Sequence, residues 1–207
     1  MKKYEFTGEV NARGLKRIRR LSDGLIGGWI AGENNLSHYN NCFVYGDAKV
    51  FGDAVVFGNA KVYGDAWVSE NAEVSGNATV SENAWVYGDA WVSENAQVYG
   101  NAKVCDNAQV YGNAAVFGNV WVSDRAVVFS NALVTCCLYF QQPRYSITAT
   151  DTHVYIGWEG YTWECWAEHI GEIGKNYKCS KEEIDQTIVL LNVLYVQIRN
   201  QINKKGS

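Results

Sequence analysis

The chain has 207 residues with a formal net charge of −4, and 47% of its residues are hydrophobic. This length allows one large domain with a substantial core, and the mild charge argues against a general nucleic-acid or membrane binder. The longest apolar run, residues 188–198, is interrupted by Asn192 and Gln197. It is too short to span a bilayer, which takes about 20 residues.

Residues 1–20 lack the apolar stretch of a secretory signal, because basic residues stand in its place at positions 16, 17, 19 and 20. The six cysteines form no CxxC pair. Cysteines of a protein that is not exported are usually reduced thiols. We therefore expect a cytoplasmic protein without a disulfide framework.

Residues 1–43 do not follow the repeat that begins after them, and we expect them to form an N-terminal cap. Their stretch 13–21 (RGLKRIRRL) interleaves basic residues with Leu and Ile. One interpretation is a contact with an anionic ligand or nucleic acid. The other, which we favour, is a cap whose charges lie against acidic turns of the first coil, because the open end of a repeat core needs covering.

The central region, residues 44–134, is a repeat with a period of six. It runs as fifteen consecutive hexads without insertion or deletion, from VYGDAK at 44–49 to VFSNAL at 128–133. The first position is Val in all fifteen hexads, and the fifth is Ala in all but one, where Val120 stands. The fourth is Asn or Asp in all but one, where Arg125 stands. Such self-similarity indicates a solenoid.

Each hexad position has a physical interpretation. A β-branched Val favours extended backbone and packs well inside a sheet, and an invariant Ala indicates a space too tight for a larger side chain. Gly-Asp, Gly-Asn or Glu-Asn between them predicts a corner, since Gly and Asn tolerate positive φ. Each hexad is then one short strand plus one corner, and successive coils stack about 4.8 Å apart.

The repeat resembles the hexapeptide signature of left-handed parallel β-helix proteins, in which an aliphatic residue is followed four places later by a small one. The resemblance implies triangular coils of three hexads with a left hand, and hence five coils here. The segment 26–48, with its GGWI, NLS and a Cys before VYG, resembles the leading segment of such proteins in phages and prophages. It implies a protein of phage type in the cytoplasm of a bacterial host cell.

With three hexads per coil, every third hexad should lie on the same face. We take the second and sixth positions of one hexad as an outward pair on one face. The first predicted face, from hexads 1, 4, 7, 10 and 13, then has seven aromatics in ten places, against three on each other face. A monomer rarely exposes a large aromatic patch, and interfaces are enriched in aromatics. We therefore expect this face at a homotrimer interface, since hexapeptide β-helix proteins are typically trimers; stacking between neighbouring coils is the competing explanation.

Residues 135–207 should form a small α+β segment. The stretch 145–157 alternates around Thr150-Asp151, which predicts a β-hairpin. Residues 158–170, with tryptophans at 158, 163 and 166, are expected to contain a short helix. Ser180 and Glu183 form a capping box, which opens an amphipathic helix to about residue 203. Its predicted seam steps by four and three, with these residues: Ile184, Ile188, Leu191, Tyr195, Ile198 and Ile202. Val189, Leu190, Val193 and Leu194 widen the apolar surface, so we expect the helix to be buried on more than one side.

An enzyme has to be weighed, because the best-known hexapeptide proteins are acyltransferases and carbonic anhydrases. The acyltransferases use a histidine as general base beside a loop that bulges from a coil, and the anhydrases need three histidines for zinc. The fifteen hexads contain neither a histidine nor an inserted loop; the histidines are His38, His153 and His169. Cys165 and His169 can meet on a helical face, but two ligands are weak evidence for a metal. We expect no metal site, no cofactor and no enzyme, with a hexapeptide acyltransferase as the less favoured alternative.

Two non-enzymatic functions remain. In the first, a small nucleotide-like ligand binds in the grooves between subunits, because aromatic rings combined with cations suit a nucleobase and its phosphate. The residues expected to bind it are Lys49, Trp67, Trp85, Lys103, Trp121, Trp91, Lys61 and Arg125. A phage-type protein of this kind would sequester a nucleotide immune signal. In the second, the trimer is a structural rod or a polymer-forming protein.

Overall fold

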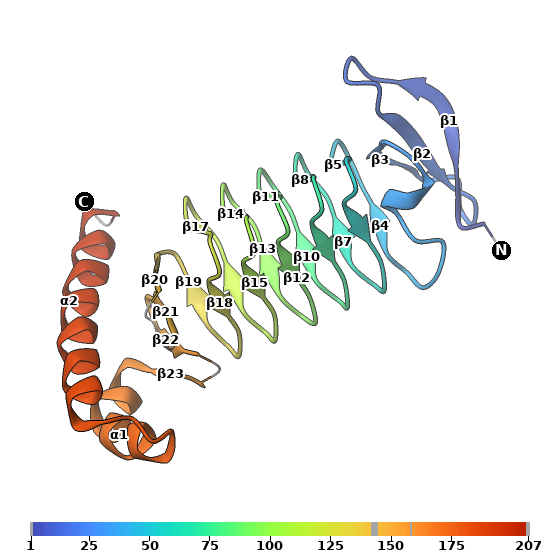
Figure 1. Ribbon diagram of the computed structural model, residues 1–207. Helices are drawn as coiled ribbons and strands as arrows, with labels where there is room; N and C mark the ends of the chain where they lie inside the picture. The colour runs from blue at the N-terminus through green and yellow to red at the C-terminus, as the bar shows by residue number, and fades with distance from the viewer. Residues whose placement is uncertain (1, 142–144, 158, 206–207) are drawn as a thin grey trace.

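A computed structural model describes residues 2–141, 145–157 and 159–205. Three stacks of short parallel strands wind into a rod of about six turns (Figure 1). A β-hairpin stands at its N-terminal end, and a small antiparallel sheet followed by two helices covers the other end. The predicted β-solenoid with an α+β C-terminal segment is confirmed, whereas the left hand stays a prediction of the resemblance.

Each hexad supplies a two-residue strand made of its sixth position and the first position of the next hexad. Sheet 1 contains β5 (Lys49–Val50), β8 (Trp67–Val68), β11 (Trp85–Val86), β14 (Lys103–Val104) and β17 (Trp121–Val122). Sheet 2 contains β6 (Val55–Val56), β9 (Glu73–Val74), β12 (Trp91–Val92), β15 (Gln109–Val110) and β18 (Val127–Val128). Sheet 3 contains β4 (Phe43–Val44), β7 (Lys61–Val62), β10 (Thr79–Val80), β13 (Gln97–Val98), β16 (Ala115–Val116) and β19 (Leu133–Val134).

The core of the rod is the column of first and fifth hexad positions, as the repeat predicts. Every first-position Val from Val44 to Val134 is fully buried, and every fifth-position side chain is buried as well. Val120, the single exception to Ala at the fifth position, is accommodated inside with a slightly higher exposure of 4%. The prediction that all Val and Ala side chains point inward is confirmed.

The corners differ in detail from the prediction that Gly and Asn share the positive φ. The third position alone has positive φ, in all fifteen hexads, and six of these residues are not glycine: Glu70, Glu82, Glu94, Asp106, Asp124 and Ser130. The fourth-position Asn side chains instead bond to one another between coils. Along one corner Asn59, Asn77, Asn95, Asn113 and Asn131 form a continuous ladder of amide hydrogen bonds of 3.0–3.1 Å.

The predicted grouping of outward residues into faces is wrong. A strand runs from a sixth position through the next first position to the next second position, as the backbone bonds of Lys49 and Phe51 to neighbouring coils show. The corner therefore separates the second and sixth positions of one hexad and places them on different sheets. Regrouped by sheet, sheet 1 has five aromatics at these positions and sheets 2 and 3 have four each. The excess of seven in ten disappears.

The rod has about six turns in place of the five coils predicted, because the first coil begins before the hexads. In sheet 1, β1 (Tyr4–Val10), β2 (Lys16–Arg20) and β3 (Ile26–Ile30) precede β5, and β3 pairs in parallel with it. The short 3-10 helix η1 (Glu33–Asn35) follows. Gly28 of the GGWI motif lies where a Cβ would come within 2.5 Å of the Ala48 carbonyl oxygen, so only glycine fits. Arg17 pairs with Asp47 at 3.1 Å, so a charge of the basic stretch lies against the first acidic corner, as the cap interpretation predicts.

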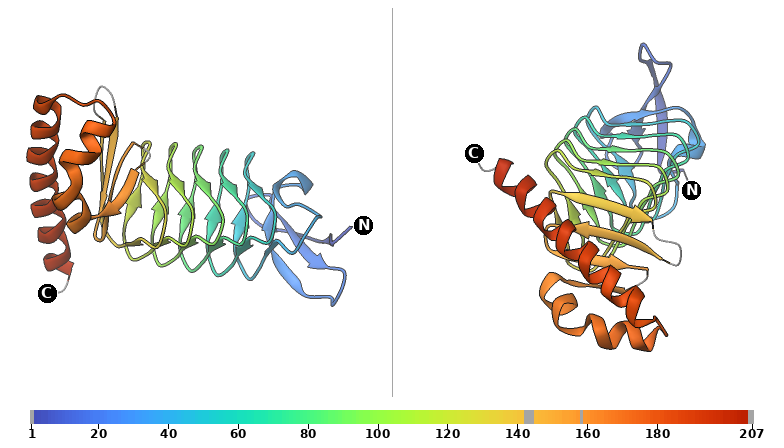
Figure 2. Two further views of the ribbon diagram at one scale, coloured as in Figure 1. Left: turned by 90° about the horizontal axis from the view of Figure 1, so that it is seen from below. Right: turned by 60° about the vertical axis from the view of Figure 1, so that its left-hand side comes forward.

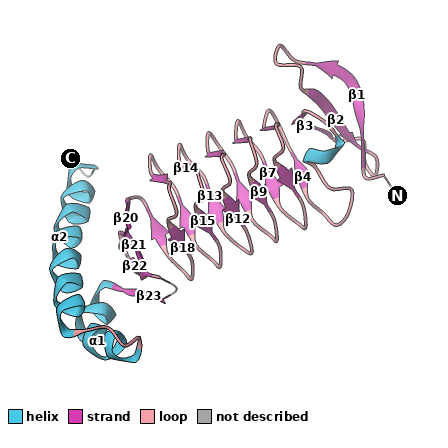
Figure 3. Cartoon of the chain, viewed as in Figure 1, coloured by secondary structure: helices cyan, strands magenta, loops and turns pink. Residues whose placement is uncertain are grey.

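The C-terminal segment closes the other end of the rod (Figure 2). Its sheet contains β20 (Cys137–Gln141), β21 (Ser146–Thr150), β22 (His153–Ile156) and β23 (Glu159–Thr162), all antiparallel. One surface of this sheet meets the last coil through Tyr155, whose hydroxyl donates to the Phe129 carbonyl oxygen at 2.7 Å. The other packs on the helices α1 (Trp163–Asn176) and α2 (Lys181–Lys205) (Figure 3).

Most predicted features of this segment are present. The hairpin is β21–β22, and Ser180 and Glu183 exchange the two hydrogen bonds of a capping box at 2.7 and 3.2 Å. The seam of α2 is partly wrong, because Ile188 and Tyr195 are exposed whereas Thr187 and Leu194 are buried beside Leu191 and Ile198. Of the three tryptophans, Trp163 and Trp166 are buried in α1, and Trp158 lies outside the described residues.

Candidate functional site

A column of indoles and cations runs along sheet 1. The sixth positions of its strands pair in register, so that Lys49, Trp67, Trp85, Lys103 and Trp121 follow one another from coil to coil. Trp29 of β3 stands before Lys49 in the same column. Five of the eight predicted ligand-binding residues therefore lie together, and we call this column the indole ladder.

The rings and charges of the indole ladder contact one another directly. Trp67 and Trp85 stack with ring centroids 5.0 Å apart and planes 6° apart. The Lys103 ammonium lies 4.8 Å from the Trp85 ring centroid and 4.4 Å from that of Trp121. A cation this close to an indole face is attracted by about 0.5–2 kcal/mol. The prediction that Lys103 stands between two indoles is confirmed.

The N-terminal half of the ladder is closed by the cap. Arg13, in the turn between β1 and β2, places its guanidinium 4.4 Å from the Trp67 ring centroid, and Lys49 approaches the same ring at 5.5 Å. Arg17 covers Trp29 in the same way at 4.7 Å. The C-terminal half is open, since Trp85 is 38% exposed and Trp121 is 56% exposed. The segment Trp85–Lys103–Trp121 is thus the accessible part.

The role of the basic stretch in this column was not predicted. Neither Arg13 nor Trp29 belongs to a hexad, and Trp29 lies 20 residues before its partner Lys49 instead of the 18 that separate coils in the repeat. A strict spacing of 18 residues therefore does not predict the place of Trp29 in the column. The signal available in the sequence was the GGWI motif, which predicts an extended segment leading into the first coil.

Beside the open segment, sheet 1 carries a buried thiol. Hydrogen bonding with Cys105, together with burial, raises the pKa of the Tyr87 hydroxyl to about 12. Burial also raises the pKa of the Cys105 thiol above its ordinary value. A thiol in this state is a poor nucleophile because the thiolate is the reactive form. Cys105 is therefore a poor candidate for a nucleophile beside the ladder.

The other predicted ligand-binding residues are dispersed. Trp91 is on sheet 2, where it lies between Glu73 and Gln109. Lys61 is on sheet 3 between Phe43 and Thr79. Arg125 is at a corner between sheets 1 and 2, on the wall of a cavity that faces the C-terminal helices. The structure does not bring these three together with the ladder.

The candidate metal ligands at the C-terminal end form a pair on α1. The Cys165 sulfur and His169 Nδ1 are 3.9 Å apart, and the same ring nitrogen is 3.1 Å from the Cys165 carbonyl oxygen. Among the described residues, no cluster of three or more His, Cys, Asp or Glu side chains could hold a metal ion. In the same part of the chain, none of the helices combines the length and the apolar character that crossing a membrane requires.

Comparison with known proteins bears on the coils alone. The profile of a family described as YdcK Beta solenoid repeat matches residues 72–88 and 108–124. Both matched stretches lie within the hexads, so this chain is similar to that family in its solenoid repeat. No curated protein matches the chain.

Proposed function

We propose that this protein is a non-catalytic homotrimer that binds a small anionic ligand with a planar ring, such as a nucleotide, on the open part of the indole ladder. The observation that supports the proposal is the position of Lys103 between Trp85 and Trp121. Both of these tryptophan side chains are solvent-accessible. A cation between two exposed aromatic faces offers stacking to a ring and charge to a phosphate.

The spacing of the ladder suits such a ligand. Trp85 and Trp121 are two strands apart, or about 9.6 Å at the usual strand spacing. A planar ring between two others needs about 7 Å, twice the usual carbon contact distance. When the flexible Lys103 stem turns outward, a ring can take its place while the ammonium meets the phosphate. Stacking of one base on an aromatic side chain contributes about 1–3 kcal/mol.

The homotrimer follows from the resemblance to hexapeptide β-helix proteins, and the indole ladder would border a groove between subunits. A position on the three-fold axis is disfavoured, because three copies of Lys103 would face one another there and repel. The phage-type leading segment supports a nucleotide immune signal as the ligand, held stoichiometrically in the cytoplasm of a bacterial host cell.

The proposal is tested by titrating the full-length protein with adenine and guanine nucleotides while following tryptophan fluorescence. We expect quenching in the wild type and affinity about tenfold weaker in Lys103→Glu, a loss of about 1.4 kcal/mol. The matched control is Lys61→Glu, which makes the same change at the same hexad position on sheet 3. Equal binding by wild type and Lys103→Glu would contradict the assigned site.

Native mass spectrometry of protein purified from its host gives the oligomer and any co-purified ligand together. A trimer that never binds a ligand would favour the structural rod instead. If Lys103→Glu dissociates the trimer, the ladder is the interface and the ligand site must lie near Trp91 or Lys61. Acetyl transfer from acetyl-CoA that is lost on replacing His38, His153 or His169 would overturn the non-catalytic assignment.

A further inference from the structure

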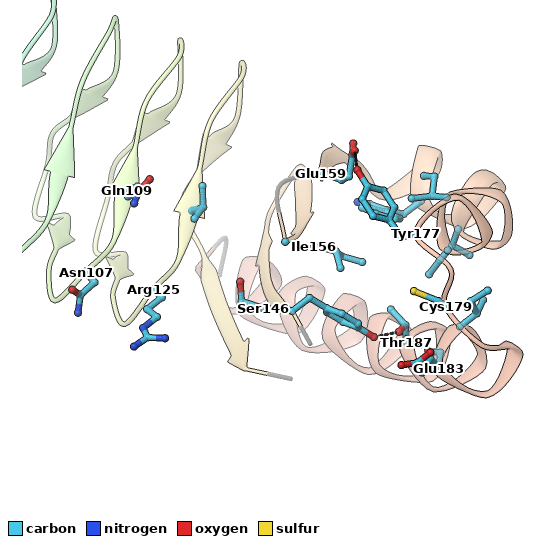
Figure 4. Close-up of a pocket in the computed structure, with 18 residues that line it drawn as sticks. Asn107, Gln109, Arg125, Ser146, Ile156, Glu159, Tyr177, Cys179, Glu183 and Thr187 are labelled. Atoms are coloured by element: carbon cyan, nitrogen blue, oxygen red, sulfur yellow. Dashed lines mark hydrogen bonds between the residues drawn. The ribbon is translucent and has the colours of Figure 1, made fainter. Parts of the chain in front are cut away.

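A cavity of about 570 Å³ lies between the corner of two late coils and the C-terminal helices (Figure 4). This volume is within the range of about 300–1,000 Å³ that is common for small-molecule sites. The coil side of the cavity consists of Asn107, Gln109, Arg125 and Val127. The C-terminal sheet, α1 and the first turns of α2 supply the rest of the lining. The cavity is separate from the indole ladder.

The coil side carries a cation where the repeat calls for an amide or a carboxylate. Arg125 is the only fourth-position residue of the fifteen hexads that is neither Asn nor Asp. Two coils earlier in the same corner, fourth-position side chains bond to each other, with Asn71 donating to Asp89 at 2.8 Å. Within the described ranges, no carboxylate lies within ion-pair distance of the Arg125 guanidinium. Its charge is therefore available to a ligand.

The two carboxylates of the cavity, Glu159 of β23 and Glu183 of α2, lie away from Arg125 and already have partners (Figure 4). Glu159 accepts hydrogen bonds from the hydroxyl groups of Tyr161, at 2.8 Å, and Tyr177. These bonds hold the Glu159 pKa below its ordinary value, so this side chain is negative at neutral pH. Glu183 accepts from the backbone N–H of Ser180. An anionic group is repelled by these two carboxylates and attracted to Arg125. The charges therefore set the orientation in which a ligand with one anionic end would bind.

Between these charged ends the lining is apolar. Ile156 comes from β22, Ile170 and Ile173 from α1, and Ile184 from α2. The Trp166 indole N–H is already committed to the Val154 carbonyl oxygen at 2.8 Å, so its ring adds apolar surface without a free donor. A hydrocarbon chain here would be removed from water, with a gain of about 0.8 kcal/mol for each buried CH₂ group.

We propose that this cavity binds a small amphiphile with a single anionic head group, of the class of medium-chain carboxylates. The head group lies at Arg125 and the chain extends toward α1 and α2. This site uses none of the residues of the indole ladder. The proposal can therefore be right or wrong independently of the function proposed above.

The test compares two probes with the same chain and opposite head groups, dodecanoate and dodecyltrimethylammonium, by calorimetry on the full-length protein below their micelle concentrations. We expect the wild type to bind dodecanoate at least about tenfold more tightly, because its head group can form charge-assisted hydrogen bonds with the guanidinium. Arg125→Asn restores the residue type of the repeat and should fold normally. It should lose this preference, whereas the control Lys61→Asn should keep it.

Variants that fill the cavity provide a second test. Ile170→Trp should abolish binding of both probes, and Ile173→Phe serves the same purpose if the first variant fails to fold. Unchanged dodecanoate affinity in Arg125→Asn would overturn the head-group assignment. Binding that survives a filled cavity, or no binding of either probe to the wild type, would overturn the site. A crystal structure of the oligomer in which a neighbouring copy covers the cavity would also overturn it.

Discussion

The coils and the C-terminal segment bury their cores in different ways. In the coils, Val and Ala enter the core through fifteen copies of one local geometry, and each coil contacts only its neighbours. In the C-terminal segment, one sheet separates two cores. Its Tyr155 faces the last coil, whereas Ile147 and Val154 face the helices. The core of the coils is therefore built from many similar small contributions, one from each hexad. The core of the C-terminal segment depends instead on single residues that come together from distant parts of the chain.

The candidate sites follow the same division. The indole ladder exists because every coil places its sixth position at the same point of the sheet, so that Trp85, Lys103 and Trp121 stack without any special arrangement. The cavity lies where the coils meet the C-terminal segment, and its coil side includes Arg125, the one departure from Asn or Asp at the fourth position. A regular region thus makes extended columns, whereas the cavity lies at its boundary.

The largest effect should come from the C-terminal core. Leu194 is fully buried there in α2, and Leu194→Ala should destabilise the helical segment by about 2–5 kcal/mol through lost burial and a residual cavity. Denaturation followed by the far-ultraviolet helix signal measures it. The neighbouring Val193→Ala is the control, since this side chain is 49% exposed and should change stability little. Equal effects of the two changes would contradict the assigned core face.

A change inside the coils should cost less, because neighbouring coils share the strain. Ala90 is buried at the fifth position of a middle coil, and Ala90→Leu should overpack the core by about 1–3 kcal/mol. Ala115→Leu, at an outward sixth position, is the matched control and should be nearly neutral. Chemical denaturation followed by tryptophan fluorescence compares them. If Ala90→Leu does not change the free energy of unfolding, the interior of the coil has space for a larger side chain and the predicted close packing is wrong.

The acidic corners should have a smaller effect. Glu82 has a φ of 59°, and its carboxylate accepts the backbone N–H of Gly100 one coil later at 3.1 Å. Glu82→Ala keeps the strained backbone but loses this bond, and should destabilise the protein by about 0.5–1.5 kcal/mol. Glu82→Gly loses the bond but relieves the strain, so it should be the milder change. Thermal unfolding compares both variants with the wild type. The reverse order would show that the backbone strain at position 82 contributes little, and an unchanged stability of Glu82→Ala would show that the carboxylate plays no part.

The smallest effect should be a loss of stability at acidic pH. Burial holds the pKa of His38 in the cap, and of His153 in the C-terminal sheet, below the ordinary value. The unfolded chain then takes up protons more readily, so these residues stabilise the fold fully above about pH 6.5 and lose that contribution as the pH falls below it. The melting temperature should therefore drop between about pH 7.5 and about pH 5.5. His38→Asn should reduce the drop, and an unchanged pH profile in this variant would contradict the role of His38.

The sequence by itself determined most of the coil region. The period of six, with Val at the first position and Ala at the fifth, identified the buried columns, and the corner residues located the turns. The capping box of α2 and the hairpin at 146–156 could also be predicted, because each depends on hydrogen bonds or alternation within a few residues. These are local properties, in which a residue's neighbours along the chain set its environment.

Only the tertiary structure decided which outward residues share a face, because the period of six does not by itself place a sixth position on the same sheet as the second position of the next hexad. It also decided that Arg13 of the cap covers Trp67, that Tyr195 of the predicted seam is exposed, and that Arg125 lines a cavity. Each of these depends on how separate elements pack against one another. Such packing is fixed by the shapes of the two surfaces that meet, and no periodicity within one segment contains that information.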